Sequence, residues 1–146
     1  MFKTLLKRLN GTVTTAPLST DDARLAMAAL MVRVARADHD YAPAEVAVID
    51  ALLMDRYGLD ATETAALRAE AEALETDAPD TVRFTRLIKS AVPYEDRNAV
   101  AESLWRIVLA DDKRHHHEDS FLRLVVSLLG VSDIDSGLAR QRAQAD

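Results

Sequence analysis

The sequence predicts an all-α fold, a bundle of seven or eight helices. Apolar residues recur at helical spacing along most of the chain, and no segment shows sustained alternation with a period of two. Glycine and proline number only four each, which is little material for a turn-rich β fold. The 146 residues, 49% of them hydrophobic, can bury a substantial core. We expect residues 1–18 to form a short amphipathic helix with a linker, and residues 19–146 to form the helical domain.

The first predicted helices differ in how far they should be buried. Residues 2–9 have one narrow apolar stripe, and residues 11–18, which include three Thr and one Pro, form the linker. The next helix starts at residues 19–21 and ends near Ala37. It carries only two charges after Leu25, both arginines, so we expect a helix that is buried at the centre of the bundle.

Two further helices in the first half begin and end at recognisable cap residues. Pro43 suits the first helical position, and Gly58 suits the end of the same helix. Asp60 followed by Glu63 predicts a reciprocal cap, in which each side chain accepts the backbone N–H of the other residue. The helix that follows is rich in Ala and Glu and should reach about Leu74.

The second half begins with two more predicted helices. Residues 77–79 open the first, and its expected core residues are Val82, Phe84, Leu87 and Ile88. Pro93 begins a longer helix that ends near Ala110. The expected buried part of this helix comprises Leu104, Trp105, Ile107, Val108 and Leu109.

Two helices complete the predicted fold. One spans residues 121–129 and stops at Gly130. Ser132 then caps a final helix, which carries Ile134 and Leu138. With the helices described above, this completes the bundle.

The sequence also contains an internal repeat. Residues 30–59 align with residues 103–131 at an offset of 73, with a slip of one residue near the end. The alignment matches Arg33 with Arg106, Ala37-Asp38 with Ala110-Asp111, Glu45 with Glu118, and Gly58 with Gly130. Each copy reads as a buried helix, an acidic turn and a second helix that ends at Gly. Two such helical hairpins can pack about a pseudo-twofold axis and bury both apolar faces.

The two acidic turns supply candidate ligands for a divalent metal ion. In each copy a Glu follows an Asp by seven residues, the spacing between the fifth and twelfth positions of an EF-hand loop. The rest of the EF-hand pattern is missing, so only the convergence of carboxylates is expected. The candidate ligands are Asp38, Asp40 and Glu45 in the first turn, and Asp111, Asp112 and Glu118 in the second. Without a cation these carboxylates would repel one another if both turns lay on one side.

An alternative interpretation of the acidic turns needs no metal. Acidic residues favour helix N-termini because they accept backbone N–H bonds and meet the positive end of the helix dipole. Both turns precede helices, so inherited capping would also explain the matched positions.

Three consecutive histidines, His115, His116 and His117, precede Glu118. Imidazole nitrogens suit zinc. Consecutive residues on a helix point in different directions, so at most one or two of them could join a site. We therefore expect calcium as the metal, and zinc bound through these histidines is the alternative. If no metal binds, the histidines are the solvent-exposed start of a helix.

The acidic turns resemble a known family. Residues 37–45, Ala-Asp-His-Asp-Tyr-Ala-Pro-Ala-Glu, resemble the Ala-Asp-Gly-x-x-x-x-x-Glu signature of tellurite-resistance TerB-like proteins. Residues 110–118 and the Leu-Leu-Gly-Val of residues 128–131 resemble the second copy. The likeness covers about residues 20–143. His39 departs from the usual Gly, and Lys113-Arg114 bring positive charge into the second turn, so the first site is the better match.

The resemblance implies an all-α bundle with an internal pseudo-twofold and an acidic cluster that binds a divalent metal. It also implies association with stress-response or tellurite-resistance systems at the inner face of the membrane. No enzymatic activity is established for the family.

Charge and composition bound the partners. The net charge is −6, but residues 1–20 carry +3 with no acid, so the remainder is strongly acidic. Such a body would repel nucleic acid and suits a cation or a basic protein surface. We expect a protein partner of unknown identity. Residues 2–9 could contact an anionic membrane weakly, or pack on the domain or on a partner.

The sequence favours a non-catalytic protein of the cytoplasm. It has no cysteine, which excludes disulfides, thiolate metal sites and a cysteine nucleophile. Paired Glu-x-x-His motifs, His-Glu-x-x-His and a phosphate-binding glycine loop are all missing. A metal-dependent enzyme is the remaining catalytic alternative. No signal-peptide pattern and no apolar run of roughly 20 residues is present, which favours the cytoplasm.

Overall fold

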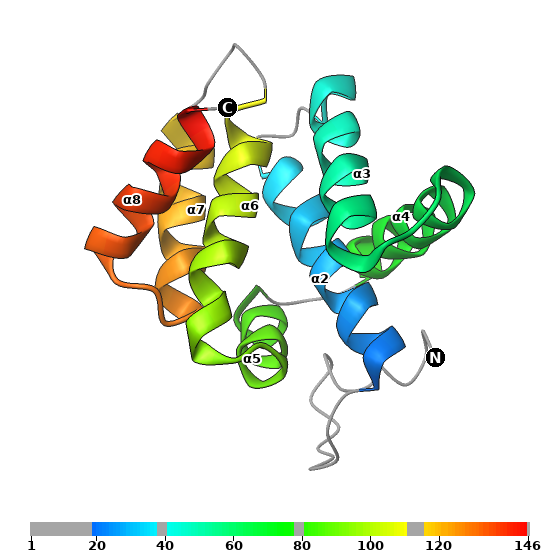
Figure 1. Cartoon of the computed structure of the whole chain (residues 1–146), viewed down its shortest axis with the longest axis horizontal. Helices are drawn as coiled ribbons and strands as arrows, with labels where there is room; N and C mark the ends of the chain where they lie inside the picture. The colour runs from blue at the N-terminus through cyan, green and yellow to red at the C-terminus, as the bar shows by residue number, and fades with distance from the viewer. Residues whose placement is uncertain (1–18, 38–40, 78–80, 111–115, 146) are drawn as a thin grey trace.

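The computed structural model describes residues 19–37, 41–77, 81–110 and 116–145, without the side chains of residues 116–119. Over these ranges the chain is helical and contains no strand, which confirms the predicted all-α class. The predicted helix over residues 2–9 and its linker lie outside the described residues. The elements, shown in Figure 1, are α2 (Thr20–Ala35), α3 (Pro43–Tyr57), α4 (Ala61–Asp77), α5 (Thr81–Ala91), the 3-10 turn η1 (Tyr94–Asp96), α6 (Arg97–Val108), α7 (His116–Leu128) and α8 (Asp133–Gln144).

Helix α2 lies at the centre of the fold and contacts five other helices, α3, α4, α5, α6 and α7. From Leu25 to Ala35 every residue except Arg33 is buried. A helix that is apolar on nearly all sides must be covered on nearly all sides, because exposed apolar surface costs free energy in water. The prediction of a buried central helix is confirmed.

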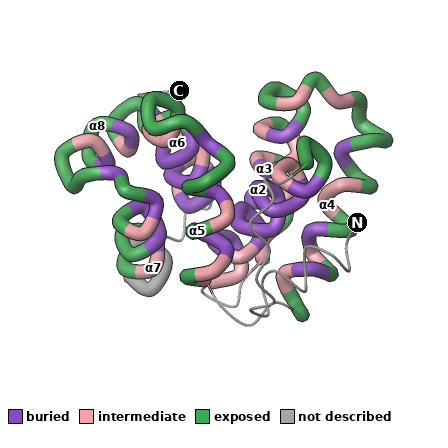
Figure 2. Tube along the Cα trace, turned by 90° about the horizontal axis from the view of Figure 1, so that it is seen from below, coloured by how far each residue is buried: buried purple, intermediate pink, exposed green. Residues whose placement is uncertain are grey.

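The other helices form two groups beside this centre. Helix α4 packs most extensively on α2, and α8 packs most extensively on α6. In Figure 1, α6, α7 and α8 lie together on one side and α3 and α4 on the other, with α5 below α6. Figure 2 shows that buried residues follow the facing sides of the helices, while the outer surfaces of α3, α4 and α8 are largely exposed.

The predicted caps are present. Pro43 occupies the first turn of α3, and Gly58 ends that helix with φ +65°, in the left-handed region that favours glycine. The N–H of Asp60 donates to Glu63 Oε1 at 3.1 Å, and the N–H of Glu63 donates to Asp60 Oδ1 at 2.7 Å. Ser132 Oγ accepts the N–H of Asp135 at 3.1 Å at the start of α8.

Three details of the prediction were wrong. Val82 is 42% exposed, because α5 presents Phe84, Thr85 and Ile88 to the core and a residue two positions before Phe84 lies roughly 200° around the helix. Pro93 begins no long helix: the 3-10 turn η1 comes first, and α6 starts at Arg97. Helix α7 begins at His116, five residues before the predicted start at residue 121.

One buried polar contact joins α6 to α8. The indole Nε1–H of Trp105 donates to Ser136 Oγ at 3.1 Å, and both residues are buried. The expected core position of Trp105 is thereby confirmed. A buried indole N–H is costly to leave without an acceptor, so this contact specifies how α8 seats on α6.

We expect Ser136→Ala to lower the free energy of unfolding by about 1–3 kcal/mol, because it leaves the Trp105 N–H buried without its acceptor. Urea unfolding followed by circular dichroism measures this. Ser127→Ala, at an exposed serine of α7, is the control and should change stability little. Equal stabilities of the two variants would contradict the role given to this contact.

Candidate functional site

Most of the predicted metal ligands lie outside the part of the chain that the structure describes. Asp38 and Asp40 fall in residues 38–40, Asp111 and Asp112 fall in residues 111–115, and the side chain of Glu118 is also outside. The same holds for the side chains of the four histidines, His39, His115, His116 and His117. Glu45 is the one predicted ligand whose surroundings are described, together with the residues that flank the first turn.

Glu45 is fully buried, with 0% of its surface exposed, in the first turn of α3. Its Oε1 accepts the backbone N–H of Ala42 at 3.1 Å, so the carboxylate caps the helix. Burial opposes the charged form of a carboxylate, which needs hydrogen-bond donors or positive charge around it to stay ionised. Carboxylate oxygen is also the donor type that calcium and magnesium prefer, so the donor chemistry of Glu45 fits such an ion.

Both ends of the first acidic turn are tied to α4. Before the turn, Arg36 Nη1 donates to Glu75 Oε1 at 2.9 Å and to the carbonyl of Glu72 at 3.3 Å. After the turn, the hydroxyl of Tyr41 donates to Glu72 Oε2 at 2.8 Å. The Arg36 guanidinium also lies 5.0 Å from the centre of the Tyr41 ring. Residues on either side of positions 38–40 are therefore held on one stretch of α4.

Arg33 adds further contacts with α4 and joins them to the core. Its Nε donates to Glu75 Oε2 at 3.2 Å, and its Nη2 donates to the carbonyl of Glu75 at 3.2 Å. Its Nη1 donates to Thr81 Oγ1 at 3.3 Å, and its guanidinium lies 4.8 Å from the centre of the Phe84 ring. Glu75 thus pairs with both arginines at the C-terminal end of α2, Arg33 and the cap residue Arg36, in a site largely shielded from water.

A second branch of the network reaches α3. Arg68 Nε donates to Asp50 Oδ1 at 2.7 Å, and its Nη1 lies 3.4 Å from Glu72 Oε2. The hydrogen bond to Asp50 raises the pKa of Arg68, so this guanidinium stays charged. Burial, followed by the hydrogen bond to Glu72 and the charge of that carboxylate, raises the pKa of Tyr41 well above its ordinary value of 10.0.

The prediction from sequence missed this network. Its signal was present, because Arg33 and Arg36 are the only charges in an otherwise apolar stretch of α2 and must be met by acids on neighbouring helices. Which acids those are could not be read from spacing, since Glu72 and Glu75 lie about forty positions away.

The second half of the chain has a related contact. Arg106 Nη2 lies 3.3 Å from Glu102 Oε2 within α6, and the same carboxylate accepts from Arg142 Nε of α8. Here α8 packs on α6 as α4 packs on α2. The described residues before the second turn, Leu109 and Ala110, are apolar, whereas Arg36 precedes the first turn.

Within the described ranges, no three or more His, Asp or Glu side chains are grouped in a way that could hold a metal ion. The described helices also include none long and apolar enough to cross a membrane.

Comparison with known protein families places most of the chain within one family model. A family model described as tellurite resistance protein TerB matches residues 24–141, which is most of the chain. No curated protein and no solved structure matches the chain.

We expect Tyr41→Phe to lower the free energy of unfolding by about 1 kcal/mol at neutral pH, because it removes the hydrogen bond to Glu72. The pKa of Tyr41 is raised in the folded state, so above about pH 10 the unfolded chain releases this proton first and the stabilisation from Tyr41 declines. The stability difference between wild type and variant should therefore shrink as the pH rises past that value.

Denaturant unfolding at a series of pH values measures this difference. Tyr94→Phe is the matched control, because Tyr94 is 69% exposed, and it should leave stability unchanged at neutral pH. If the difference in free energy of unfolding between wild type and Tyr41→Phe stays constant or widens with rising pH, the role given to the Tyr41 hydroxyl is contradicted.

Proposed function

The chain belongs to the family of the tellurite resistance protein TerB, and from that membership we propose that it is a helical module that binds a divalent metal ion at its acidic turns and catalyses no reaction. The proposed ligands are Asp38, Asp40 and Glu45 in the first turn, with Asp111, Asp112 and Glu118 in the second. Calcium is the expected ion, since all six ligands offer carboxylate oxygen. The cytoplasm is the expected compartment, and the expected partner is a protein that distinguishes the metal-bound form from the metal-free form.

The observation that carries the proposal is the burial of Glu45. The chain contains a second Glu at the same position of a helix start, Glu63 of α4, and that residue caps its helix while exposed. Capping therefore does not require burial. A carboxylate placed at 0% exposure pays a desolvation cost that a bound cation would offset.

The anchored flanks of the first turn also support a metal site. Arg36 and Tyr41 hold the two ends of the turn on α4, so less conformational entropy is lost when Asp38 and Asp40 converge on an ion. A site whose supporting residues are already positioned binds more tightly than one that must be ordered by the ligand.

We extend the proposal to the internal duplication. Helices α2, α3 and α4 correspond to α6, α7 and α8, and in each set the third helix packs most extensively on the first. Gly58 and Gly130 both have positive φ, and the next helix is capped two residues later in each case, by Asp60 and Ser132. The two sites are unequal, because Lys113 and Arg114 bring positive charge into the second turn.

A second candidate function has one observation in its favour. Since Glu45 Oε1 accepts the Ala42 N–H, the acidic turns could serve only as caps in a helical scaffold for protein–protein interaction. The two functions differ in the response to calcium and in the effect of removing the charge of Glu45 while keeping its oxygen.

Glu45→Gln separates metal binding from capping, because glutamine retains an oxygen for the Ala42 N–H and loses the charge. In the wild type, calcium at about 100 times its Kd should raise the free energy of unfolding by about 2.7 kcal/mol. In Glu45→Gln this rise should be lost while the stability without calcium is kept or increased. Thermal unfolding with and without calcium measures both quantities.

Glu63→Gln is the matched control, because Glu63 has the same capping position in α4 and is exposed. It should leave the calcium response intact. If wild type shows no response to calcium, and Glu45→Ala costs about 1 kcal/mol where Glu45→Gln costs little, the scaffold function replaces the metal function.

The two turns should also differ in affinity. We expect Asp38→Asn with Asp40→Asn to weaken calcium binding on the order of tenfold or more, because the charge of the ligand set tunes calcium affinity. Asp111→Asn with Asp112→Asn should weaken it less, since Lys113 and Arg114 already oppose the charge of that turn. Isothermal titration with calcium and with zinc, after elemental analysis of the purified protein, measures affinity and identity together. A larger loss of calcium affinity from Asp111→Asn with Asp112→Asn would show that the second turn, not the first, is the stronger site.

A further inference from the structure

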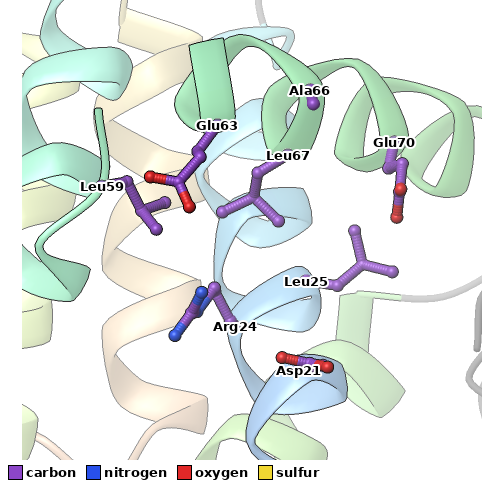
Figure 3. Close-up of a pocket in the computed structure, with 8 residues that line it drawn as sticks. All are labelled: Asp21, Arg24, Leu25, Leu59, Glu63, Ala66, Leu67 and Glu70. Atoms are coloured by element: carbon purple, nitrogen blue, oxygen red, sulfur yellow. The ribbon is translucent and has the colours of Figure 1, made fainter. Parts of the chain in front are cut away.

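A cleft lies between the start of α2 and the first half of α4. Its volume is about 370 Å³, and Leu59 of the α3–α4 connection is part of its lining. Figure 3 shows its lining, which comprises Asp21, Arg24, Leu25, Leu59, Glu63, Ala66, Leu67 and Glu70. The cleft is on the α2–α4 face and involves none of the proposed metal ligands.

The cleft combines an apolar surface with an acidic margin. The partly exposed Leu59 and Leu67, with the buried Leu25, supply the apolar part, and the exposed carboxylates Asp21, Glu63 and Glu70 lie around it. The one cation of the lining, Arg24, has its guanidinium 5.0 Å from the centre of the Tyr57 ring. A ligand that fits this lining is apolar on one side and positively charged on the other.

The chain itself contains a segment of that chemistry. Residues 2–9 have an apolar stripe of Phe2, Leu5, Leu6 and Leu9. The charges in the same segment are Lys3, Lys7 and Arg8, and no acid occurs before Asp21. The segment is thus opposite in charge to the margin of the cleft and matches its apolar surface.

The connection between segment and cleft is short enough to favour this occupant. Residues 10–18 could span about 30 Å when extended, and they end next to Ser19, the cap of α2. Asp21, Arg24 and Leu25, in the first two turns of α2, line the cleft. A tethered segment has an effective concentration of roughly millimolar order, so an interface whose Kd lies below that value is mostly occupied.

We propose that residues 2–9 bind in this cleft as an amphipathic helix, with their leucines on Leu59 and Leu67 and their cations beside Asp21, Glu63 and Glu70. Three cations and one short stripe make a weak membrane anchor, which favours the tethered cleft as the binding place.

Disulfide trapping tests the proposal in the full chain, which has no cysteine of its own. We introduce Leu6→Cys with Ala66→Cys, a residue that lines the cleft. The control is Leu6→Cys with Ala65→Cys, at an exposed neighbour on α4 that is not part of the lining. Under mild oxidation at low protein concentration, the intramolecular disulfide should form roughly tenfold faster in the first pair, as measured by mass spectrometry.

Charge reversal tests the acidic margin in the same assay. Glu70→Lys, added to the Leu6→Cys and Ala66→Cys pair, should slow trapping several-fold. Glu95→Lys, at an exposed acid of η1 outside the cleft, should not. Both positions are exposed, so the fold should be kept, and circular dichroism checks it.

Three outcomes would overturn the proposal. The first is equal trapping in both cysteine pairs, and the second is trapping only between molecules, which would point to a second copy. The third is binding of residues 2–9 to phosphatidylserine vesicles, seen as co-sedimentation of the chain, while no disulfide forms in the cleft with or without vesicles. Faster trapping at Ala66 that depends on Glu70 supports the proposal.

Discussion

Helix α2 is apolar on nearly every side, and the need to cover it organises the rest of the molecule. Five helices pack against it, and the groups formed by α3 with α4 and by α6 with α7 and α8 lie on its different sides. Beyond its first turns, the helix carries charge only towards its C-terminal end, at Arg33 and at the cap residue Arg36. Because those guanidiniums are partly enclosed, they must find acids there, and Glu75 of α4 accepts from both.

This constraint bears directly on the first acidic turn, which begins where α2 leaves the core. Glu75 of α4 pairs with the two arginines before the turn, and Glu72 of the same helix accepts from Tyr41 on the far side of the turn. The helix that covers α2 therefore also positions the turn. Glu45 lies just beyond, buried at the start of α3. The burial of this carboxylate links the fold to the proposed metal site, since a charge at that depth must be compensated.

Features set by neighbours in sequence were predicted well. The left-handed Gly58, the reciprocal cap of Asp60 with Glu63 and the cap at Ser132 depend on a few adjacent residues. Features set by orientation were predicted less well. Val82 was expected in the core but faces outward, because the packing of α5 selects one face of the helix. Apolar spacing in a short segment leaves more than one possible face.

Local pattern therefore decided the helical class, most helix limits and the identity of the acidic turns, since caps and apolar periodicity act within one or two helical turns. Long-range packing decided the rest. The pairing of Arg33 and Arg36 with Glu75, the full burial of Glu45 and the cleft between α2 and α4 all join residues far apart in the chain. Spacing along a chain carries no information about which distant helix will supply a partner or exclude water, so these features arise only when the helices pack.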